Sequence, residues 1–504
     1  MRNSSILIFS FILPVVSLFR TSIVFSQEIK WSQEQVESRR LPYLKIIGAG
    51  AKCFYSVRSD APMIDLLEAE DRKASRVLLQ CFSADMILLW EKELESPVPD
   101  SRIIHITVIG NRILTVSQKK REGAPIRDIY AQFLDEKGQF KDIPVLVDEA
   151  PLGRIDEERL PAFFMSKDRG KWSLCYRMIN NSSDSHMLCV MTADTALNVL
   201  YRKEKKINTT FKRFTPEHAV LMNDGSFHLL GRKYLTDKRI KSPEEAHYET
   251  MSFSISQNEL TNMEIRIGGK FLTDASIAAD EFNQKVVIGG FYSELGMNTS
   301  AGIFSYSFAI DSTSSSSTYF SPFTNDVLIR SVADRGDFKQ KELNNYYVDR
   351  LLVRKDGGVA VIAESYVENT QTYWDYYTRT TISHTYYRYG NILGASLNPD
   401  GRLAWNKSIQ KEQSSMDDDG YQSSYCEMLA GGAYYALFNK FIDRRSSVLF
   451  VRINGVGEVD TETLFGESDR VIVLPRSAKQ IDAKNLITPA YKQGRLYFLK
   501  ITLP

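Results

Sequence analysis

Cysteine is scarce in this sequence, and its spacing matches no familiar cysteine chemistry. The 504 residues include five cysteines, Cys53, Cys81, Cys175, Cys189 and Cys426. None forms the CxxC pair of metal and redox sites, and an odd number leaves at least one unpaired. We expect most of them to be small buried residues in strands. Cys175 and Cys189 lie symmetrically about Ser182, so we predict that they face each other on neighbouring strands, in contact rather than in a disulfide.

An excess of charge of either sign is also missing. The chain has 63 Lys and Arg residues against 62 Asp and Glu residues, a formal net charge of +1. This balance argues against a nucleic-acid partner and against a polybasic membrane-binding surface. Beyond the N-terminus no apolar run approaches the roughly 20 residues that a spanning helix needs. We therefore expect no transmembrane segment after processing.

The common catalytic and cofactor motifs are absent. The sequence has no HExxH zinc motif, no GxSxG nucleophile elbow, no phosphate loop and no dinucleotide fingerprint. Asp417, Asp418 and Asp419 offer oxygen ligands but lack the alternating spacing of a calcium loop. We predict a solvated turn there, and we expect no cofactor, no metal and no catalytic residue from motifs.

The one long apolar run lies at the N-terminus and indicates export. Residues 6–19 form an apolar stretch of about 14 residues, the length of a signal-peptide core and too short for a comfortable membrane span. Val24-Phe25-Ser26 suits a signal peptidase, so we place the signal peptide at residues 1–26 with cleavage before Gln27. The protein is then periplasmic, at the cell surface or secreted.

Hairpin signals fill the rest of the chain. In Tyr387–Ile409, alternating apolar residues flank the turn Asn398-Pro399-Asp400-Gly401. Two kinds of hairpin alternate along the sequence at intervals of roughly 55 to 74 residues, at or a little above the period of a four-stranded propeller blade. We count eight of the first kind, the last around Gln493, and seven of the second kind.

This pattern predicts an all-β fold, a β-propeller of four-stranded antiparallel blades. Seven blades are preferred, with one terminal segment completing a blade from the other end of the chain, and eight blades are the alternative. Residues 27–504 form a single propeller domain with insertions at 311–349 and 366–389. Loops on such a scaffold tolerate added length and commonly hold specificity.

The segment that follows the second insertion resembles a known group of proteins. Trp405, Lys407, Lys411, Gln413 and Ser414 are followed by the phrase Tyr421–Tyr425 (YQSSY). This order resembles that of uncharacterised secreted β-propeller-like proteins of Gram-negative bacteria. The resemblance implies a propeller fold and an exported location, and no activity comes with it.

The insertion at 366–389 is unusually aromatic. Residues 373–387 are nearly symmetric about Thr380, which predicts a hairpin that places Tyr373 opposite Tyr387 and Trp374 opposite Tyr386. The candidate binding residues are the aromatic side chains of this hairpin: Tyr373, Trp374, Tyr376, Tyr377, Tyr386 and Tyr387. Such side chains suit stacking on sugar rings or docking of a protein. Alternatively, they only support their own hairpin or fold back onto the next blade.

Two functions follow from these observations. The first is a non-catalytic binding or scaffold protein of the cell envelope or extracellular space, which binds a protein or glycan through propeller loops. The alternative is a carbohydrate-active enzyme, a hydrolase or lyase, with carboxylates in the central depression. Fold alone does not separate them, because one propeller scaffold hosts many functions.

Overall fold

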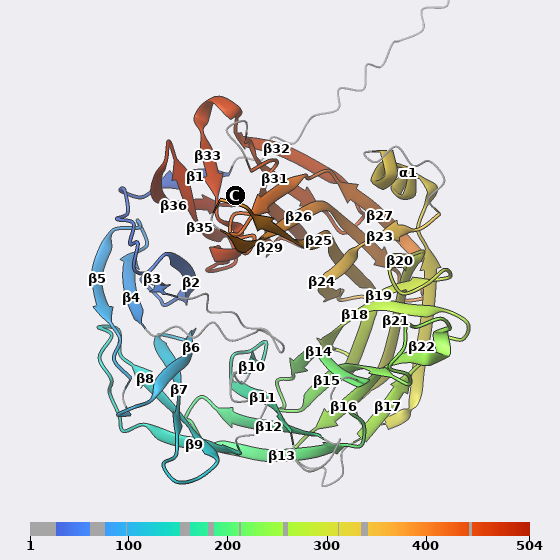
Figure 1. The fold of residues 1–504 in the computed structure, drawn as a ribbon, viewed down its shortest axis with the longest axis horizontal. Helices are drawn as coiled ribbons and strands as arrows, with labels where there is room; N and C mark the ends of the chain where they lie inside the picture. Colours follow the sequence, from blue (N-terminus) through green and yellow to red (C-terminus); the bar gives the residue numbers. More distant parts are fainter. Residues whose placement is uncertain are drawn as a thin grey trace, which may run out of the picture.

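The chain forms a ring of β-sheets around a central axis (Figure 1). The computed structural model describes residues 27–60, 76–96, 98–151, 162–179, 186–210, 213–255, 261–310, 312–333, 341–377, 379–442 and 446–504. The predicted signal peptide, residues 1–26, lies outside these residues. Within them, no helix is both long enough and apolar enough to cross a membrane.

The strands group into successive antiparallel blades. The first four blades are β2 (Tyr43–Ala49), β3 (Cys53–Ser59), β4 (Val77–Ser83) and β5 (Leu88–Glu93); β6 (Arg102–Ile109), β7 (Arg112–Lys120), β8 (Ile126–Leu134) and β9 (Val145–Pro151); β10 (Ala162–Met165), β11 (Lys171–Ile179), β12 (His186–Asp194) and β13 (Val199–Ile207); and β14 (Phe214–Leu221), β15 (Phe227–Tyr234), β16 (Ala246–Phe253) and β17 (Thr261–Ile265).

The remaining blades follow the same order. They are β18 (Phe271–Asp280), β19 (Lys285–Ser293), β21 (Gly302–Ala309) and β22 (Ser312–Pro322); β24 (Tyr346–Val353), β25 (Val359–Asp375), β26 (Thr380–Leu397) and β27 (Leu403–Ile409), with β28 (Gln413–Met416) beside β26; β29 (Cys426–Ala430), β30 (Ala433–Asn439), β31 (Val448–Ile453) and β32 (Val459–Phe465); and β33 (Val471–Val473) with β34 (Lys479–Gln480), β35 (Asn485–Lys492), β36 (Arg495–Thr502) and β1 (Glu28–Trp31).

Short elements lie between the blades. They are the two-stranded sheet of β20 (Thr299–Ser300) and β23 (Leu343–Asn344), the helix α1 (Asn325–Ala333), and the 3-10 turns η2 (Pro243–Glu245), η3 (Glu467–Asp469) and η4 (Pro475–Ser477). The first insertion, 311–349, thus holds all of β22, then α1, β23 and the first residues of β24.

The two ends of the chain share the last sheet. Strand β1 pairs with β36, from Glu28 opposite Thr502 to Trp31 opposite Leu499. The prediction that one terminal segment completes a blade is therefore confirmed. Closure of this kind removes the exposed sheet edges that an open row of blades would leave.

The described residues form eight sheets of four or five strands. This is one more than the preferred count of seven and agrees with the alternative of eight. The hairpin at Gln493 joins β35 to β36, the second and third strands of their sheet, and so differs from the other seven of its kind. The turn that the sequence interpretation missed follows β34, at residues 481–484.

The core lies between neighbouring sheets. Leu44 and Ile46 of β2 pack with Phe498 of β36 across the closure. Equivalent apolar clusters lie between the other neighbouring blades. Because each sheet is covered on both faces, strands such as β19 (KVVIGGFYS) are buried almost along their whole length and read as continuous apolar runs.

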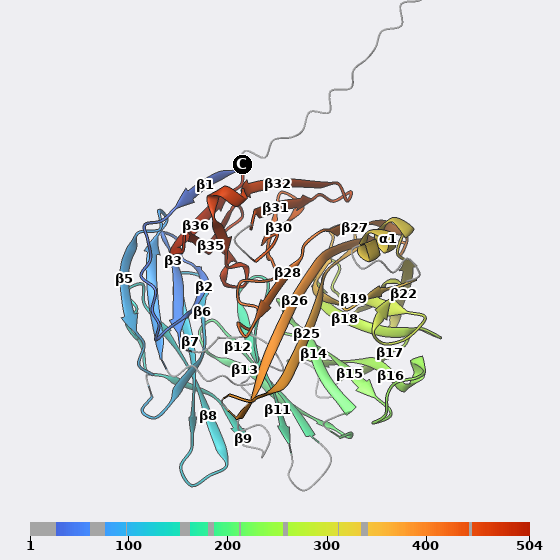
Figure 2. The same cartoon turned by 45° about the horizontal axis from the view of Figure 1, so that its top comes forward.

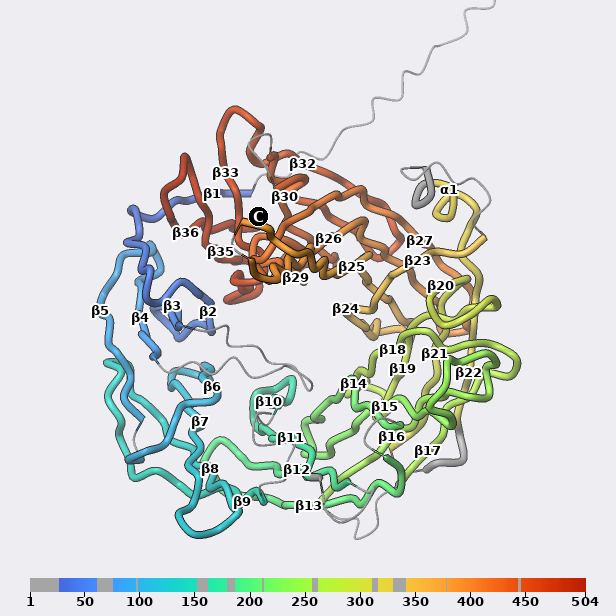
Figure 3. Tube along the Cα trace, viewed as in Figure 1, coloured from blue at the N-terminus to red at the C-terminus, as the bar shows by residue number. Residues whose placement is uncertain are grey.

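The second insertion extends β25 and β26 into a long hairpin. It stands off the ring toward the viewer in Figure 1, and the tilted view in Figure 2 shows it running across the front of the ring. The tube in Figure 3 follows the same path.

The predicted register of this hairpin is wrong. Tyr373 lies opposite Ile382 and Trp374 opposite Thr381, whereas Tyr386 faces Asn369 and Tyr387 faces Glu368. The last cross-strand pair before the turn is Asp375 with Thr380. The Asp375 carboxylate accepts a hydrogen bond from the Tyr377 amide and so starts the turn there. Cross-strand aromatic pairing did not decide the register.

The predicted pairing of Cys175 with Cys189 is also wrong, by one residue. Cys175 lies opposite Val190, and Cys189 lies opposite Tyr176. A one-residue shift places the two thiols on opposite faces of the sheet. All five cysteines are free thiols.

Candidate active site

Five blades share an irregularity in the strand nearest the ring axis (Figure 1). The pairing shifts by one residue between Ile46 and Gly48, Ile103 and His105, Pro216 and His218, Leu272 and Asp274, and Val348 and Arg350. The bulged residues are Ile47, Ile104, Glu217, Thr273 and Asp349. A β-bulge re-aims a side chain and is common beside functional sites. In the fourth and sixth blades the re-aimed side chain is an acid.

Asp349 is the bulged residue of the sixth blade. Its Oδ2 accepts a hydrogen bond of 2.8 Å from the hydroxyl of Tyr425, in the loop before the seventh blade. Asp349 is exposed, yet protein surrounds it closely. This desolvation, followed by the negative charge of Glu364, raises the pKa of Asp349 to about 8.

A second carboxyl lies on the first strand of the next blade. Glu427 of β29 forms an ion pair with Arg350, in which Nη2 and Oε1 are 2.7 Å apart. Burial raises the pKa of Glu427, and Arg350 opposes the rise. Two adjacent residues of β24 thus contact the start of the seventh blade: Asp349 through Tyr425, and Arg350 through its ion pair with Glu427.

The neighbouring blades contribute two further carboxyls. Arg232 lies 2.7 Å from Oε1 of Glu217 and 3.9 Å from Oδ1 of Asp274, and the Tyr248 hydroxyl donates to Glu217 at 2.8 Å. Burial raises the pKa of Asp274 to about 7, against the opposing effect of Arg232. The Val348 amide donates to Asp274 at 2.5 Å and so joins this cluster to the Asp349 strand.

A buried network connects these strands to the base of the hairpin. Lys411 Nζ lies 2.5 Å from Glu364 Oε1 and donates to Gln413 at 3.0 Å. The Ser424 hydroxyl donates to the other oxygen of Glu364 at 2.7 Å. Ser424 immediately precedes Tyr425, the partner of Asp349. Residues of the segment 411–425 therefore connect β24, which contains Asp349, to the base of the β25–β26 hairpin.

Sequence reasoning did not find these acids, because they lie in different blades and form no local motif. Glu217, Asp274, Asp349 and Glu427 come from the first strands of the fourth to seventh blades. One signal was present: Glu217 precedes the turn glycine Gly225 by eight residues, as Asp349 precedes Gly357. An acid eight residues before the turn glycine thus marks a carboxyl on the first strand of a blade, which the ring brings close to the first strands of the adjacent blades.

The hairpin aromatics predicted as a binding site divide between two surfaces. Tyr373 and Tyr386 lie on one face of the hairpin, and Trp374 and Tyr387 lie on the other, as alternation along the ladder requires. Tyr373 and Trp374 are 49% and 53% exposed, and Tyr376 and Tyr377 at the tip are 84% and 100% exposed. These four do not fold back onto a blade, and the six residues form no single platform.

The exposure of the tip supports a stability prediction. Residues 370–385 join Asn369 to Tyr386, which are cross-strand partners, so a two-residue Asn-Gly turn can replace them without changing the register. Shorter loops also close at lower entropic cost. We expect the deletion variant to unfold in one calorimetric transition within a few degrees of the parent. A broad or split transition would mean that the hairpin is part of the core.

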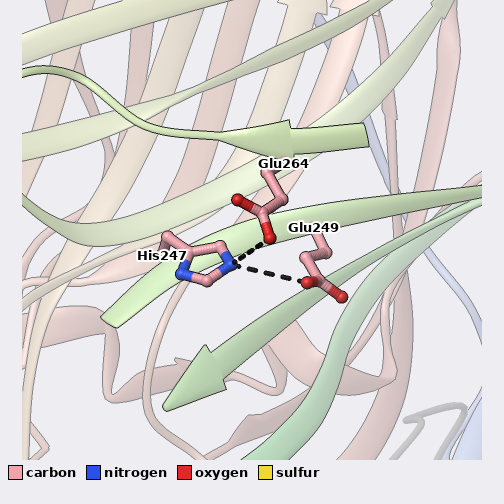
Figure 4. Close-up of side chains that lie close together, drawn as sticks. All are labelled: His247, Glu249 and Glu264. Atoms are coloured by element: carbon pink, nitrogen blue, oxygen red, sulfur yellow. Dashed lines mark hydrogen bonds and ion pairs between the residues drawn. The ribbon is translucent and has the colours of Figure 1, made fainter. Parts of the chain in front are cut away.

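One group of residues could hold a cation. The ligand atoms of His247, Glu249 and Glu264 lie within 4.8 Å of one another on β16 and β17 (Figure 4). The imidazole Nε2 is 3.4 Å from Glu249 and 3.6 Å from Glu264. However, Lys233 lies 2.5 Å from the same Glu249 oxygen, and Arg266 lies 3.1 Å from Glu264. These two cations already balance both carboxylates, so the group fits a protein ion network better than a metal site.

No protein-family model and no curated protein matches the chain. Among solved structures, the chain is similar to Pyrococcus horikoshii acylaminoacyl peptidase (10% identity, 90% of this chain and 59% of that one, TM-score 0.37). It is also similar to an oligogalacturonate lyase in complex with manganese (9%, 95% and 96%, 0.36) and to the β-propeller domain of a Pyrococcus furiosus trilobed protease (10%, 88% and 97%, 0.34).

These findings correct one interpretation of the sequence. The sequence favours a non-catalytic binding or scaffold protein, whereas the similar structures are a peptidase, a lyase and a domain of a protease. The chain spans about three fifths of the peptidase. At such low identities and TM-scores no activity is transferred, so the chemistry must be argued from the side chains of this protein.

Proposed function

We propose that the protein is a carbohydrate-active enzyme, a hydrolase or lyase, whose acid–base carboxyls lie on the first strands of the sixth and seventh blades. The observation that carries the proposal is Asp349, an exposed carboxyl on a bulged strand whose pKa is raised to about 8 and which is held by Tyr425. A carboxyl that keeps its proton near neutral pH is a suitable general acid.

The two carboxyls have different surroundings, as acid–base chemistry requires. Asp349 faces the negative charges of Glu364 and Glu427 and holds its proton. Burial also raises the pKa of Glu427, but its ion pair with Arg350 opposes the rise and favours the ionised form. Asp349 would donate a proton to the leaving-group oxygen, while Glu427 would accept one from water or from the sugar. A pair of carboxyls of unequal acidity is the usual equipment for cleaving a glycosidic bond.

Asp349→Asn tests this assignment. We expect at least about a 100-fold loss of cleavage across a panel of polysaccharides, because the amide cannot act as the acid. Reducing ends report hydrolysis, and ultraviolet absorbance of unsaturated products reports elimination. Asp460→Asn, on the outer strand β32 and paired with Arg452 at 3.4 Å, is the matched control. Equal activity of Asp349→Asn and the parent, or no cleavage by the parent on any member of the panel, would refute the proposal.

The pH profile supplies a second readout of the same variant. Because the acid must be protonated, activity of the parent should fall as pH rises through the pKa of Asp349, at about 8. Asp349→Asn should lose this limb. Its folding should not suffer, because an acid with a raised folded pKa opposes folding once pH exceeds its ordinary value near 4. Melting at pH 8 at or above that of the parent checks this point.

Export is part of the same proposal. The apolar stretch 6–19 and the small residue Ser26 support cleavage before Gln27. We expect N-terminal sequencing of material from the extracellular or periplasmic fraction to begin at Gln27. Exported protein that still contains residues 1–26 would overturn the cleavage site.

A further inference from the structure

A second group of reactive side chains lies far out on the hairpin. The Tyr373 hydroxyl and His384 Nε2 are 3.0 Å apart, and His384 Nδ1 is 2.5 Å from Asp417 Oδ2. Tyr373 lies on β25, His384 on β26, and Asp417 follows β28. Three separate segments therefore bring a phenol, an imidazole and a carboxylate into one line.

The hydrogen bonds assign the protons in this line. His384 lowers the pKa of Asp417, so the carboxylate is ionised and can only accept. In the neutral imidazole, Nδ1 then carries the proton, and Nε2 is left as the acceptor for the Tyr373 hydroxyl. This is the arrangement in which a base, oriented by a carboxylate, removes a proton from a nucleophile.

Asp417 is held in place by its backbone surroundings. Its other oxygen accepts a hydrogen bond of 2.8 Å from the Thr385 amide, and its own amide donates to the Thr385 carbonyl at 2.9 Å. Its φ of 54° lies in the left-handed region, which costs a non-glycine residue energy and is found where surrounding contacts enforce it. The three side chains are thus positioned rather than merely adjacent.

A pocket adjoins the group on the same face of the hairpin. It has a volume of about 150 Å³ and is lined by Val367, Asn369, Gln371, Tyr386 and Arg388. Gln371 is the cross-strand partner of His384, so the pocket continues directly from the imidazole. Asn369 and Gln371 provide amide donors for a developing oxyanion. Arg388 is exposed and provides a cation for an anionic group.

We infer that this face of the hairpin is a site for hydrolysis of esters that carry an anionic group, with Tyr373 as nucleophile, His384 as base and Asp417 as the residue that orients His384. The Tyr373 oxygen attacks the ester carbonyl carbon while its proton passes to His384 Nε2. The bond from that carbon to the alcohol oxygen then breaks, and the alcohol leaves with this proton. Water cleaves the acyl-tyrosine: its proton passes through His384 back to Tyr373, and the carboxylic acid is released.

The inference is tested with an arylsulfonyl fluoride, which labels activated phenols, followed by peptide mass spectrometry. Tyr377 is fully exposed and lies four residues away, so it serves as an internal reference. We expect Tyr373 to be labelled at least tenfold faster than Tyr377 despite being half as exposed. Tyr377 labelled as fast as Tyr373 would show that the hydrogen bonds only brace the hairpin.

Two variants and an ester substrate complete the test. Asp417→Asn and His384→Gln should slow Tyr373 labelling at least tenfold, and Asp418→Asn, whose carboxylate accepts from the Gly420 amide at 2.9 Å, should not. The parent should hydrolyse a 4-nitrophenyl hemisuccinate faster than 4-nitrophenyl acetate, and Tyr373→Phe should abolish this. Unchanged labelling in both variants, or unchanged hydrolysis in Tyr373→Phe, would overturn the inference. Asp349→Asn should leave both readouts intact, which separates this site from the proposed carbohydrate site.

Discussion

Lys411→Met should lower the free energy of unfolding by about 3–5 kcal/mol. The Lys411 side chain is completely buried, and that of its partner Glu364 is 4% exposed. Burial lowers the pKa of the ammonium, and Glu364 holds it charged. Removing the cation leaves a carboxylate buried beside Asp349 without a counter-charge, and this unpaired charge is the main cost. Denaturant unfolding monitored by circular dichroism measures the change.

The double variant Lys411→Met/Glu364→Met distinguishes an unpaired charge from lost packing. With both charges gone, most of the loss should be recovered, because replacing a buried ion pair by apolar side chains is often nearly neutral. Lys30→Met, which removes an exposed ion pair of 3.1 Å with Glu28, should change unfolding little. A double variant that is no more stable than the single one would mean that the network of Gln413 and Ser424 depends on Lys411 itself.

Arg232→Met should destabilise the protein by a similar amount, about 3–5 kcal/mol at pH 8. The guanidinium is 8% exposed, pairs with Glu217 and faces Asp274. It also donates to the Thr273 carbonyl at 2.9 Å, at the bulge of β18. Methionine has a similar length but supplies neither the charge nor these donors, so two acids and a carbonyl would lose their partner.

The pH dependence of Arg232→Met identifies the cause. Asp274 has a folded pKa of about 7, above its ordinary value near 4. The folded state therefore binds the proton more tightly, and this contribution to stability is present below about pH 4 and is lost as pH rises toward 7. Without Arg232 the pKa of Asp274 should rise further, so the variant should be less impaired at pH 5 than at pH 8. Equal impairment at both pH values would exclude the carboxyls as the cause.

Arg213→Met is the matched control for Arg232. Arg213 contacts Asp237 through two nitrogens, at 2.8 and 2.9 Å, but both side chains are exposed. Exposed pairs contribute little to stability because water solvates both charges after separation. We expect its melting temperature to match that of the parent, which would show that burial rather than pairing makes Arg232 important.

The fold class was determined by local properties of the sequence. Alternating apolar residues, and turns such as Asn398–Gly401, act over a few residues and need no distant partner. The same holds for the existence of the hairpin at 366–389. The number of sheets could not be determined from local sequence properties alone. The last sheet takes its fourth strand from residues 28–31, about 470 positions away in the chain, and its first strand is divided by η4.

Registers and sites were decided only by tertiary structure. The symmetry about Thr380 and about Ser182 permits several ladders of similar local energy, and the turn at Asp375 and the burial of each sheet face select one. Asp349 and Glu427 become neighbours because the ring places consecutive blades side by side. Tyr373, His384 and Asp417 meet because β28 returns along β26. Side chains separated by tens of residues share no local pattern, so only the folded ring brings their charges and protons together.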